Sequence, residues 1–214
     1  MGLLKRELSG IIFYHRNMMQ AERLYDEVDA LRWQLSDLGE LNRENIRLRG
    51  LLSFKQRSPL RLVAARVIAR SFEAWSSSVV IDKGKKSKIN AGMAVIDLQG
   101  LVGRVIEATD NSSRVMLIND PSQGISSIVQ RSRQDGLVNG TLGANLIMRY
   151  LPEDAQIVKG DLVITSELSQ IYPKGLLIGE VINIGSDFSG LNRFAQIKPA
   201  AQLTSIEEVF VIIP

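Results

Sequence analysis

The hydrophobic periodicity of the chain changes at Pro59, and this change limits what each part can fold into. Before Pro59, apolar residues recur at alternating spacings of four and three, which is the heptad pattern of a coiled-coil helix. After Pro59 the period is two, Val, Ile and Thr are enriched, and Gly, Asn, Asp or Pro closes each run. The sequence therefore predicts a helix over residues 1–58, followed by an all-β region from residue 59.

The helical part carries one apolar stripe with a single polar member. The stripe, which we interpret as a dimerisation seam, consists of Leu24, Val28, Leu31, Leu35, Leu38, Leu41, Asn45, Leu48 and Leu52. Leu38 to Leu41 repeats a spacing of three, a stammer that overwinds a supercoil locally, and Gly39 lies at this point. Two interpretations fit the stripe. It packs the helix on its own domain, or it forms a parallel homodimer in which Asn45 meets its mate across the two-fold axis and fixes the register.

The β region reads as a series of short strands at the spacing of a barrel or a sandwich. The first six runs are 62–69, 77–82, 93–97, 102–108, 113–118 and 125–130. No amphipathic pattern of helical length interrupts them. We therefore predict a mainly β fold after the helix.

An internal repeat divides this β region. Residues 89–96 align with residues 157–164, and each copy is followed by a strand that contains a glycine, Gly103 or Gly179. A glycine inside a strand suits a bend or a close backbone approach, as a small barrel needs at its corners. Chance similarity between two β-rich segments is the alternative. We expect two related barrels, at 59–140 and 141–214, with the C-terminal strand joining either one.

The residue types that most catalytic and metal sites need are scarce. His15, in the predicted helix, is the only histidine, and the chain has no cysteine. The β region therefore cannot form a Ser-His-Asp catalytic site, a Cys-His catalytic site or a thiolate zinc site. Asp82, Asp97, Asp120 and Asp161 lie at strand ends, where aspartate usually caps a turn; the rival interpretation is a hydrolase that uses carboxylates alone. We predict no enzyme, no cofactor and no metal.

Charge and hydropathy exclude two further classes. Lys and Arg number 26 against 23 Asp and Glu, and the basic residues are scattered, which argues against a nucleic-acid-binding protein. The segment at 82–87, DKGKKS, has the look of a phosphate loop but lacks the required spacing and a following helix, so we interpret it as a solvated basic turn. No run approaches the roughly 18–20 apolar residues of a membrane span.

The ordered motifs of the chain resemble those of the bacterial rod-shape-determining MreC family. They are ENIRLRGLL at 44–52, ARVIAR at 65–70, Trp75, IDKG at 81–84, GMAV at 92–95, GLVGRV at 100–105, IND at 118–120, GDLVITS at 160–166, YPKG at 172–175 and IGEV at 178–181. Each motif alone is only a strand with a turn, whereas the ordered set is specific and falls within residues 24–213.

The resemblance implies a fold and a location. The expected fold is mainly β: an N-terminal coiled-coil helix that dimerises, then two small six-stranded β-barrels of chymotrypsin-like topology without a protease triad. The expected location is periplasmic or extracytoplasmic, with attachment to the inner membrane through an N-terminal anchor that this chain does not contain.

The resemblance also implies a function. The expected role is a non-enzymatic scaffold that maintains rod shape by binding, organising and activating peptidoglycan synthases. The direct partner would be the elongation-specific class B penicillin-binding transpeptidase, with MreD, RodA and MreB as further members of the complex. The alternative is an extracytoplasmic structural protein that assembles into filaments through helix and barrel contacts.

Partner binding requires an apolar patch with aromatic anchors. The second repeat is longer than the first by about eight residues around 166–173, and added loop length often carries specificity. The candidate partner-binding residues are Tyr150, Leu151, Tyr172, Phe188, Leu191 and Phe194. Core packing is the alternative for each, and strand addition at an open barrel edge would need no particular side chain.

Overall fold

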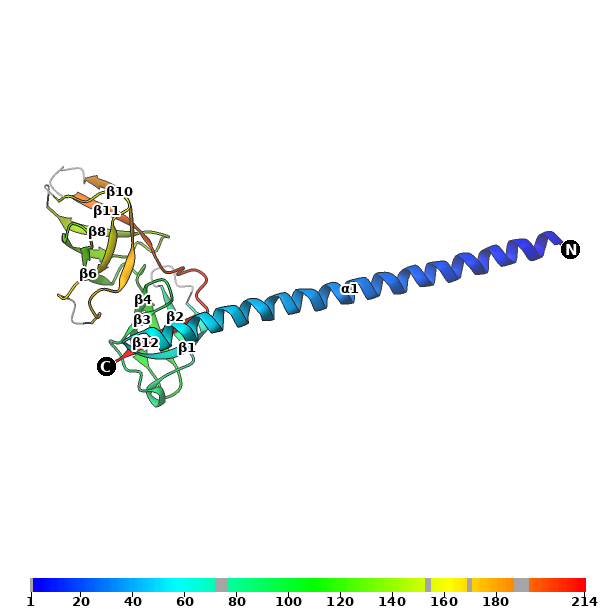
Figure 1. The fold of residues 1–214 in the computed structure, drawn as a ribbon, viewed down its shortest axis with the longest axis horizontal. Coiled ribbons are helices and arrows are strands. Elements are labelled where there is room, and N and C mark those ends of the chain that lie inside the picture. The colour runs from blue at the N-terminus through cyan, green and yellow to red at the C-terminus, as the bar shows by residue number, and fades with distance from the viewer. Residues whose placement is uncertain (1, 72–76, 153–154, 169–170, 187–192) are drawn as a thin grey trace. The chain divides into compact units, whose positions relative to one another are not determined.

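The computed structural model describes residues 2–71, 77–152, 155–168, 171–186 and 193–214, and within the helix it describes side chains at 28, 29 and from 31 onward. The chain divides into two compact units, Met1–Gln56 and Arg57–Pro214. The first is helical and the second holds every strand (Figure 1).

The first unit is one long helix, α1 (Gly2–Arg57), of 56 residues. It contains no proline, and it ends one residue before Ser58, which precedes Pro59. The residue before a proline is biased away from helical dihedral angles, so the chain itself encodes this end. The predicted N-terminal helix is confirmed.

The described residues of the second unit form twelve strands and one short 3₁₀ helix, η1 (Lys85–Ser87). The strands are β1 (Arg61–Arg70), β2 (Ser78–Ile81), β3 (Ala94–Ile96), β4 (Leu101–Ala108), β5 (Ser113–Leu117), β6 (Gly124–Val129), β7 (Asp135–Asn139), β8 (Leu146–Leu151), β9 (Leu162–Thr165), β10 (Leu177–Ser186), β11 (Arg193–Pro199) and β12 (Glu208–Ile213).

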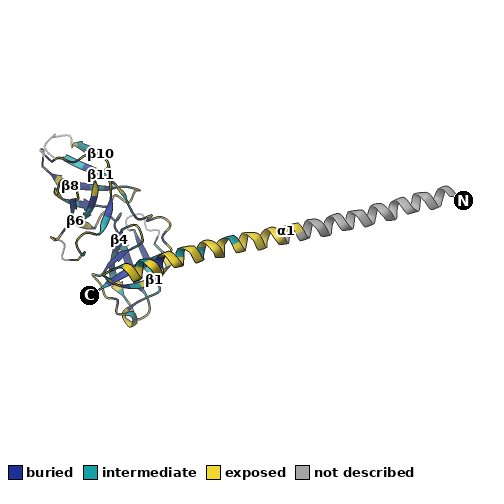
Figure 2. Ribbon diagram, viewed as in Figure 1, coloured by how far each residue is buried: buried dark blue, intermediate teal, exposed yellow. Residues whose placement is uncertain are grey.

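These strands close into two six-stranded barrels. The first has the order β1-β12-β3-β4-β5-β2, and the second has the order β10-β11-β8-β7-β6-β9. Each barrel is filled by alternating apolar residues. Figure 2 colours buried positions dark blue, and they lie along the strands of both barrels. The predicted fold of one N-terminal helix followed by two six-stranded barrels is confirmed.

The repeat and the strand order together show that the barrels exchange strands. The first half of the β region runs from β1 to β6 and the second from β7 to β12, and the two halves pair in the same pattern. In that pattern β12 lies between β1 and β3, and its counterpart β6 lies between β7 and β9. The last strand of each half thus completes the barrel that the other half builds.

This exchange corrects the expected boundary at residue 140. Both β6 and β7 end before that residue, yet they belong to the second barrel. The chain instead passes between the barrels within 118–123, after β5 and before β6. Period-two alternation shows which face of a strand is buried, but it does not show which strand is its neighbour. The C-terminal strand, β12, joins the first barrel.

The repeated glycines have the same role in both barrels. A Cβ at Gly103 would lie 2.0 Å from the carbonyl oxygen of Met116, and one at Gly179 would lie 2.1 Å from that of Lys198. No side chain fits at these distances, so the predicted close backbone approach is confirmed. The preceding turns also match, with φ of 90° at Gly92 and 94° at Gly160, a region that L residues rarely adopt.

Candidate interaction surfaces

The predicted seam of α1 is exposed to solvent over its described length. Between 41% and 69% of each apolar residue is accessible at Val28, Leu31, Leu35, Leu38, Leu41, Leu48 and Leu52. Asn45 is exposed as well, and Leu24 lies outside the described side chains. A row of seven exposed large apolar side chains on one helix is an open hydrophobic stripe, which normally marks an interaction site.

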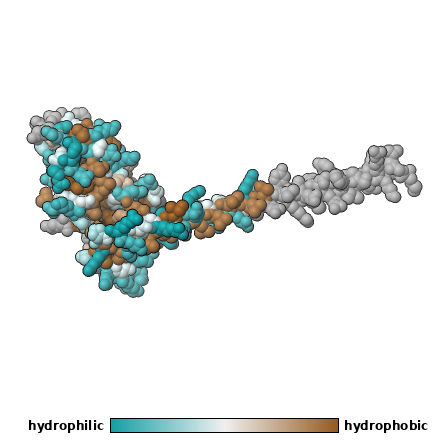
Figure 3. All heavy atoms as spheres, viewed as in Figure 1, coloured by the Kyte–Doolittle hydropathy of each residue, from teal (hydrophilic) through white to brown (hydrophobic). Residues whose placement is uncertain are grey.

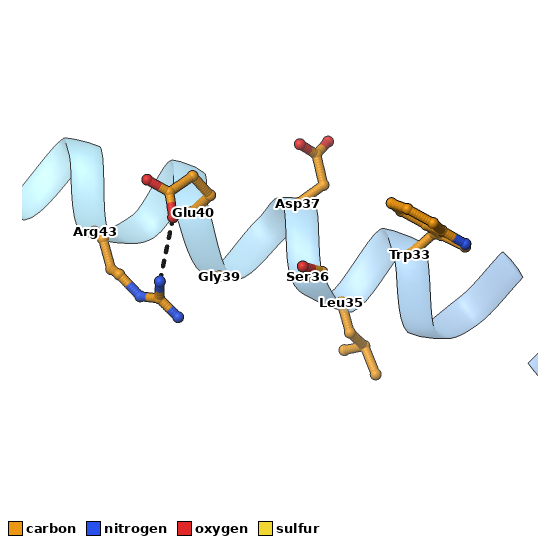
Figure 4. A pocket seen from close by; sticks show the side chains of 7 residues that line it. All are labelled: Trp33, Leu35, Ser36, Asp37, Gly39, Glu40 and Arg43. Atoms are coloured by element: carbon orange, nitrogen blue, oxygen red, sulfur yellow. Dashed lines mark hydrogen bonds and ion pairs between the residues drawn. The ribbon is translucent and has the colours of Figure 1, made fainter. Parts of the chain in front are cut away.

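The helix carries a second apolar feature that the sequence patterns did not identify. Trp33 is 78% exposed and lies five residues after Val28, on the outer side of the heptad. Figure 4 shows Trp33 and Leu35 projecting from opposite sides of the helix, with Asp37 on the side of Trp33. The sequence signal for this feature was a tryptophan at a heptad position that is normally polar.

The ion pair between Arg43 and Glu40 (3.2 Å) joins two exposed side chains of the same helix and contributes little to stability.

Among the described residues of the predicted partner-binding set, Tyr150 is the exposed one. It is 75% accessible and has a φ of 60°, the left-handed region, which is uncommon for an aromatic residue. This conformation falls at an irregularity in the pairing of β8 with β11, between the pairs Arg193↔Leu151 and Ala195↔Met148. The irregular ladder turns the ring of Tyr150 outward, so core packing does not apply to this residue.

The other described candidates are packed within the second barrel. Leu151 and Tyr172 are each only 4% exposed. Phe194 is half-buried, and its ring covers Gly185 on the neighbouring strand β10. Phe188 and Leu191 lie outside the described residues. For Leu151 and Tyr172 the core alternative is therefore the correct one, and the expectation that they anchor a partner directly is wrong.

Tyr172 instead reaches a buried hydrogen-bonding residue between the barrels. Its hydroxyl donates to Oε1 of Gln123 at 2.5 Å, and burial raises the pKa of the phenol. Nε2 of Gln123 donates to the carbonyl of Met116 in β5 (2.9 Å), and Nδ2 of Asn139 in β7 donates to the carbonyl of Gln123 (2.9 Å). Gln123, which is 2% exposed, thus connects both barrels. No pattern in the sequence marks this glutamine.

The longer loop of the second repeat does contribute to a surface, through the neighbours of Tyr172. Ile171 and Pro173 line a groove of about 420 Å³ at the junction of the barrels. The rest of its lining comes from 91–94, before and at the start of β3, and from Ile212 and Pro214 at the end of the chain. The groove wall is largely apolar, as a protein-binding site requires.

Three of the four strand-end aspartates cap turns, as predicted. Oδ1 of Asp97 accepts hydrogen bonds from the backbone of Gln99 and Gly100 (2.7 Å each), while burial raises the pKa of Asp97. Asp120 and Asp161 likewise accept from turn backbone groups.

Asp161 also forms the best-defined ion pair of the second barrel. Nε of Arg131 lies 2.7 Å from Oδ1, and an Nη of the same residue lies 2.9 Å from Oδ2. These hydrogen bonds hold the pKa of Asp161 below its usual value. The fourth strand-end aspartate, Asp82, accepts a hydrogen bond from the backbone of Arg66 in the adjacent strand (2.8 Å). All four carboxylates therefore have structural partners.

The described part of the chain contains neither a metal-binding cluster nor a membrane-spanning helix. No group of three or more His, Cys, Asp or Glu residues there is arranged to hold a metal ion. Within the same residues, no helix combines the length and the hydrophobicity that crossing a membrane requires.

Comparison with known proteins supplies the family. The model of the rod shape-determining protein MreC, barrel core, matches residues 67–213. The cell shape-determining protein MreC of Bacillus subtilis is 34% identical over 206 residues, covering 89% of this chain and 70% of that protein.

Solved structures agree with this match. One MreC structure superposes with a TM-score of 0.76 at 27% identity, covering 81% of this chain and 99% of the other. MreC from Listeria monocytogenes gives a TM-score of 0.66 at 30% identity, covering 89% and 93%. From its motifs, its two strand-exchanged barrels and these matches, the chain belongs to the MreC family of rod shape-determining proteins.

Proposed function

We propose that this chain is a non-enzymatic scaffold of the bacterial cell-elongation machinery. It dimerises through α1 and binds a class B penicillin-binding transpeptidase through its barrels, thereby organising and activating peptidoglycan synthesis. The observation that carries the proposal is the open apolar stripe on α1, together with the hydrogen-bond acceptor role of every strand-end carboxylate in the barrels.

The dimer is supported by the energetics of the stripe. Fully burying a leucine or valine side chain is worth about 1.5–3 kcal/mol, so even partial burial of the seven exposed members would outweigh the entropy cost of association. Asn45 then finds a partner amide across the two-fold axis. Figure 3 shows hydrophobic residues in brown along the described part of the helix.

Sedimentation equilibrium tests the dimer. Leu35→Lys places a charge in the seam, so we expect a monomer where the unmodified chain is a dimer. Ser36→Lys adds the same charge to an exposed neighbour outside the seam and should remain dimeric. Equal masses for the two variants would contradict the seam.

The transpeptidase partner is supported by one relative. MreC from Helicobacter pylori, which shares this fold at 18% identity and a TM-score of 0.56, has been solved in complex with the penicillin-binding protein PBP2. On this chain, exposed Tyr150 and the groove beside Ile171 offer apolar contacts of the kind that dominate such interfaces.

Binding by variants tests this assignment. Hot-spot residues cost about 2 kcal/mol or more on truncation, so Tyr150→Ala or Ile171→Asp should weaken transpeptidase binding roughly 30-fold. Ile68→Ala, which truncates an exposed residue of the first barrel, is the control. Wild-type affinity in both second-barrel variants would move the interface elsewhere on the chain.

The proposal extends to location and to other members of the machinery. Family membership supports an extracytoplasmic position with attachment to the inner membrane, and it supports MreD, RodA and MreB as further components. Co-purification of these proteins with the complete, membrane-attached protein tests the extension. Recovery of the transpeptidase without them would restrict the scaffold to a pairwise role.

A self-assembling structural protein is the second candidate. The periplasmic domain of one solved relative, at 25% identity and a TM-score of 0.61, is described as part of a cell shape-determining filament. Sedimentation mass that rises with concentration beyond the dimer would favour this function over a discrete scaffold.

A further inference from the structure

The basic turn at residues 83–88 is held rigidly at one end of the first barrel. The backbone N–H of Lys85 donates to the carbonyl of Thr109 (2.8 Å), and that of Lys86 donates to the carbonyl of Asp110 (3.1 Å). Between the turn and the 109–112 hairpin the fit is close, because a Cβ at Gly84 would lie 2.2 Å from the carbonyl oxygen of Thr109. The lysines of the turn are therefore presented on a fixed backbone.

The charge of this turn is largely uncompensated. Lys83 pairs with Asp82 (3.2 Å), whereas Lys85, Lys86 and Lys88 are exposed and make no ion pair with any described residue. The acidic groups on the adjoining elements are Asp82, Asp110 on the packed hairpin, Glu107 on β4, which pairs with Arg114, and Glu208 on β12. Arg66, exposed on β1 beside Asp82, lies opposite Glu208 of β12, so this pair adds no net charge. The net result is a positively charged platform.

The platform lies at the end of the first barrel that faces away from the second. Strand β4 begins just after Gly100. A Cβ at Gly100 would lie only 2.4 Å from the carbonyl oxygen of Leu177 in the second barrel, so the two backbones approach closely there. The strand ends at Ala108, next to the hairpin that supports the turn. Eight strand residues span roughly 25 Å, so the platform lies about that far from the contact between Gly100 and Leu177.

We propose that the basic turn docks the first barrel onto an anionic phospholipid surface. Lysine provides strongly hydrated point charges, which suit attraction to many headgroups better than the bidentate recognition of a single phosphate. The turn has no aromatic residue on which a nucleic-acid base could stack, and this disfavours a nucleic-acid partner. This docking goes beyond the proposed scaffold function and does not depend on transpeptidase binding.

Vesicle co-sedimentation of the complete chain tests the proposal. Vesicles contain equal parts of phosphatidylglycerol and phosphatidylcholine, or phosphatidylcholine alone. A lysine near an anionic surface contributes roughly fivefold in partitioning, so we expect a loss on the order of a hundredfold in Lys85→Gln/Lys86→Gln/Lys88→Asn. Asparagine is used at position 88 because Lys88 has a φ of 63°, which asparagine tolerates well.

Matched variants separate the turn from net charge and from folding. Lys55→Gln/Lys159→Gln/Lys198→Gln removes the same charge from exposed lysines elsewhere and should bind like the unmodified chain. Lys85→Arg/Lys86→Arg keeps the charge and should also retain binding. Rising salt should release the unmodified chain.

Several results would overturn the proposal. One is equal binding of the unmodified chain to both vesicle types. Another is an equal loss of vesicle binding in the turn variant and in the control variant at Lys55, Lys159 and Lys198. A third is unchanged vesicle binding by the turn variant. Failure of the unmodified chain to bind anionic vesicles would also reject a membrane surface as the partner. This holds even if the chain captures soluble polyphosphate or single-stranded DNA.

Discussion

At the scale of single residues, Gln123 shows how the two barrels share a polar core. Its amide and its backbone carbonyl contact Met116 in the first barrel, and Asn139 and Tyr172 in the second. Each of these bonds is buried or partly buried, where an unmade hydrogen bond is expensive. The residue that sequence analysis placed in a binding loop, Tyr172, is therefore a structural residue.

Tyr172→Phe should destabilise the fold. The change leaves Oε1 of Gln123 without this donor in a buried site, at a cost of about 1–3 kcal/mol. Chemical denaturation measures this cost. Tyr150→Phe is the matched control and should stay within about 0.5 kcal/mol, because Tyr150 is exposed. Equal midpoints for the two variants would contradict the role of Gln123.

Asp161 should make stability depend on acid pH. Because Arg131 lowers the pKa of Asp161 in the folded state, its contribution is present above the unfolded pKa of about 4 and is lost as pH falls through the folded pKa. At neutral pH, Asp161→Asn should cost roughly 1.5–3 kcal/mol, the range for hydrogen bonds to charged groups. The difference from wild type should shrink in strong acid.

Urea titrations at neutral pH and near pH 3 check this prediction. Asp135→Asn, at an exposed position, serves as the control and should behave like wild type at both values. A deficit in Asp161→Asn that is independent of pH would mean that packing, and not the ion pair, is responsible.

At the scale of elements, the sequence predicted α1 and the strands well because both signals are local. The heptad stripe and Pro59 define α1, and period-two runs define β1 to β6 to within two residues. Strand neighbours depend on long-range pairing, which alternation does not encode, so the boundary at residue 140 was misplaced. Tyr150 and Tyr172 could not be told apart, because the irregular pairing that exposes Tyr150 has no sequence signature.

Asn45→Leu tests the seam as an element. If Asn45 is buried in a dimer, replacing it removes the cost of burying an amide, about 1–3 kcal/mol, and thermal stability should rise. Register and oligomer specificity should loosen at the same time. Thermal melts together with sedimentation check both effects. A strictly dimeric and less stable variant would refute the buried position of Asn45.

At the scale of the whole molecule, strand exchange makes the two barrels one folding unit. The chain crosses from the first barrel to the second before β6 and returns with β12. Neither half of the sequence can therefore complete its own barrel. This interdependence agrees with the single compact unit at Arg57–Pro214.

Phe210→Ala should reveal this coupling. Phe210 lies on β12, is 1% exposed and fills the first barrel, so its truncation should cost about 3–5 kcal/mol. If the barrels unfold together, amide hydrogen exchange should accelerate in both, at Val115 in the first and Val138 in the second. Unchanged protection at Val138 would show that the second barrel folds independently.

We propose that the barrels bind a class B penicillin-binding transpeptidase while α1 dimerises the scaffold. The most direct measurement titrates the purified transpeptidase ectodomain with the complete chain, and again with a chain that begins at Arg57, the first residue of the barrel unit. We expect saturable binding by both chains. Binding by neither chain would contradict this proposal, and binding by the longer chain alone would move the contact to the helix.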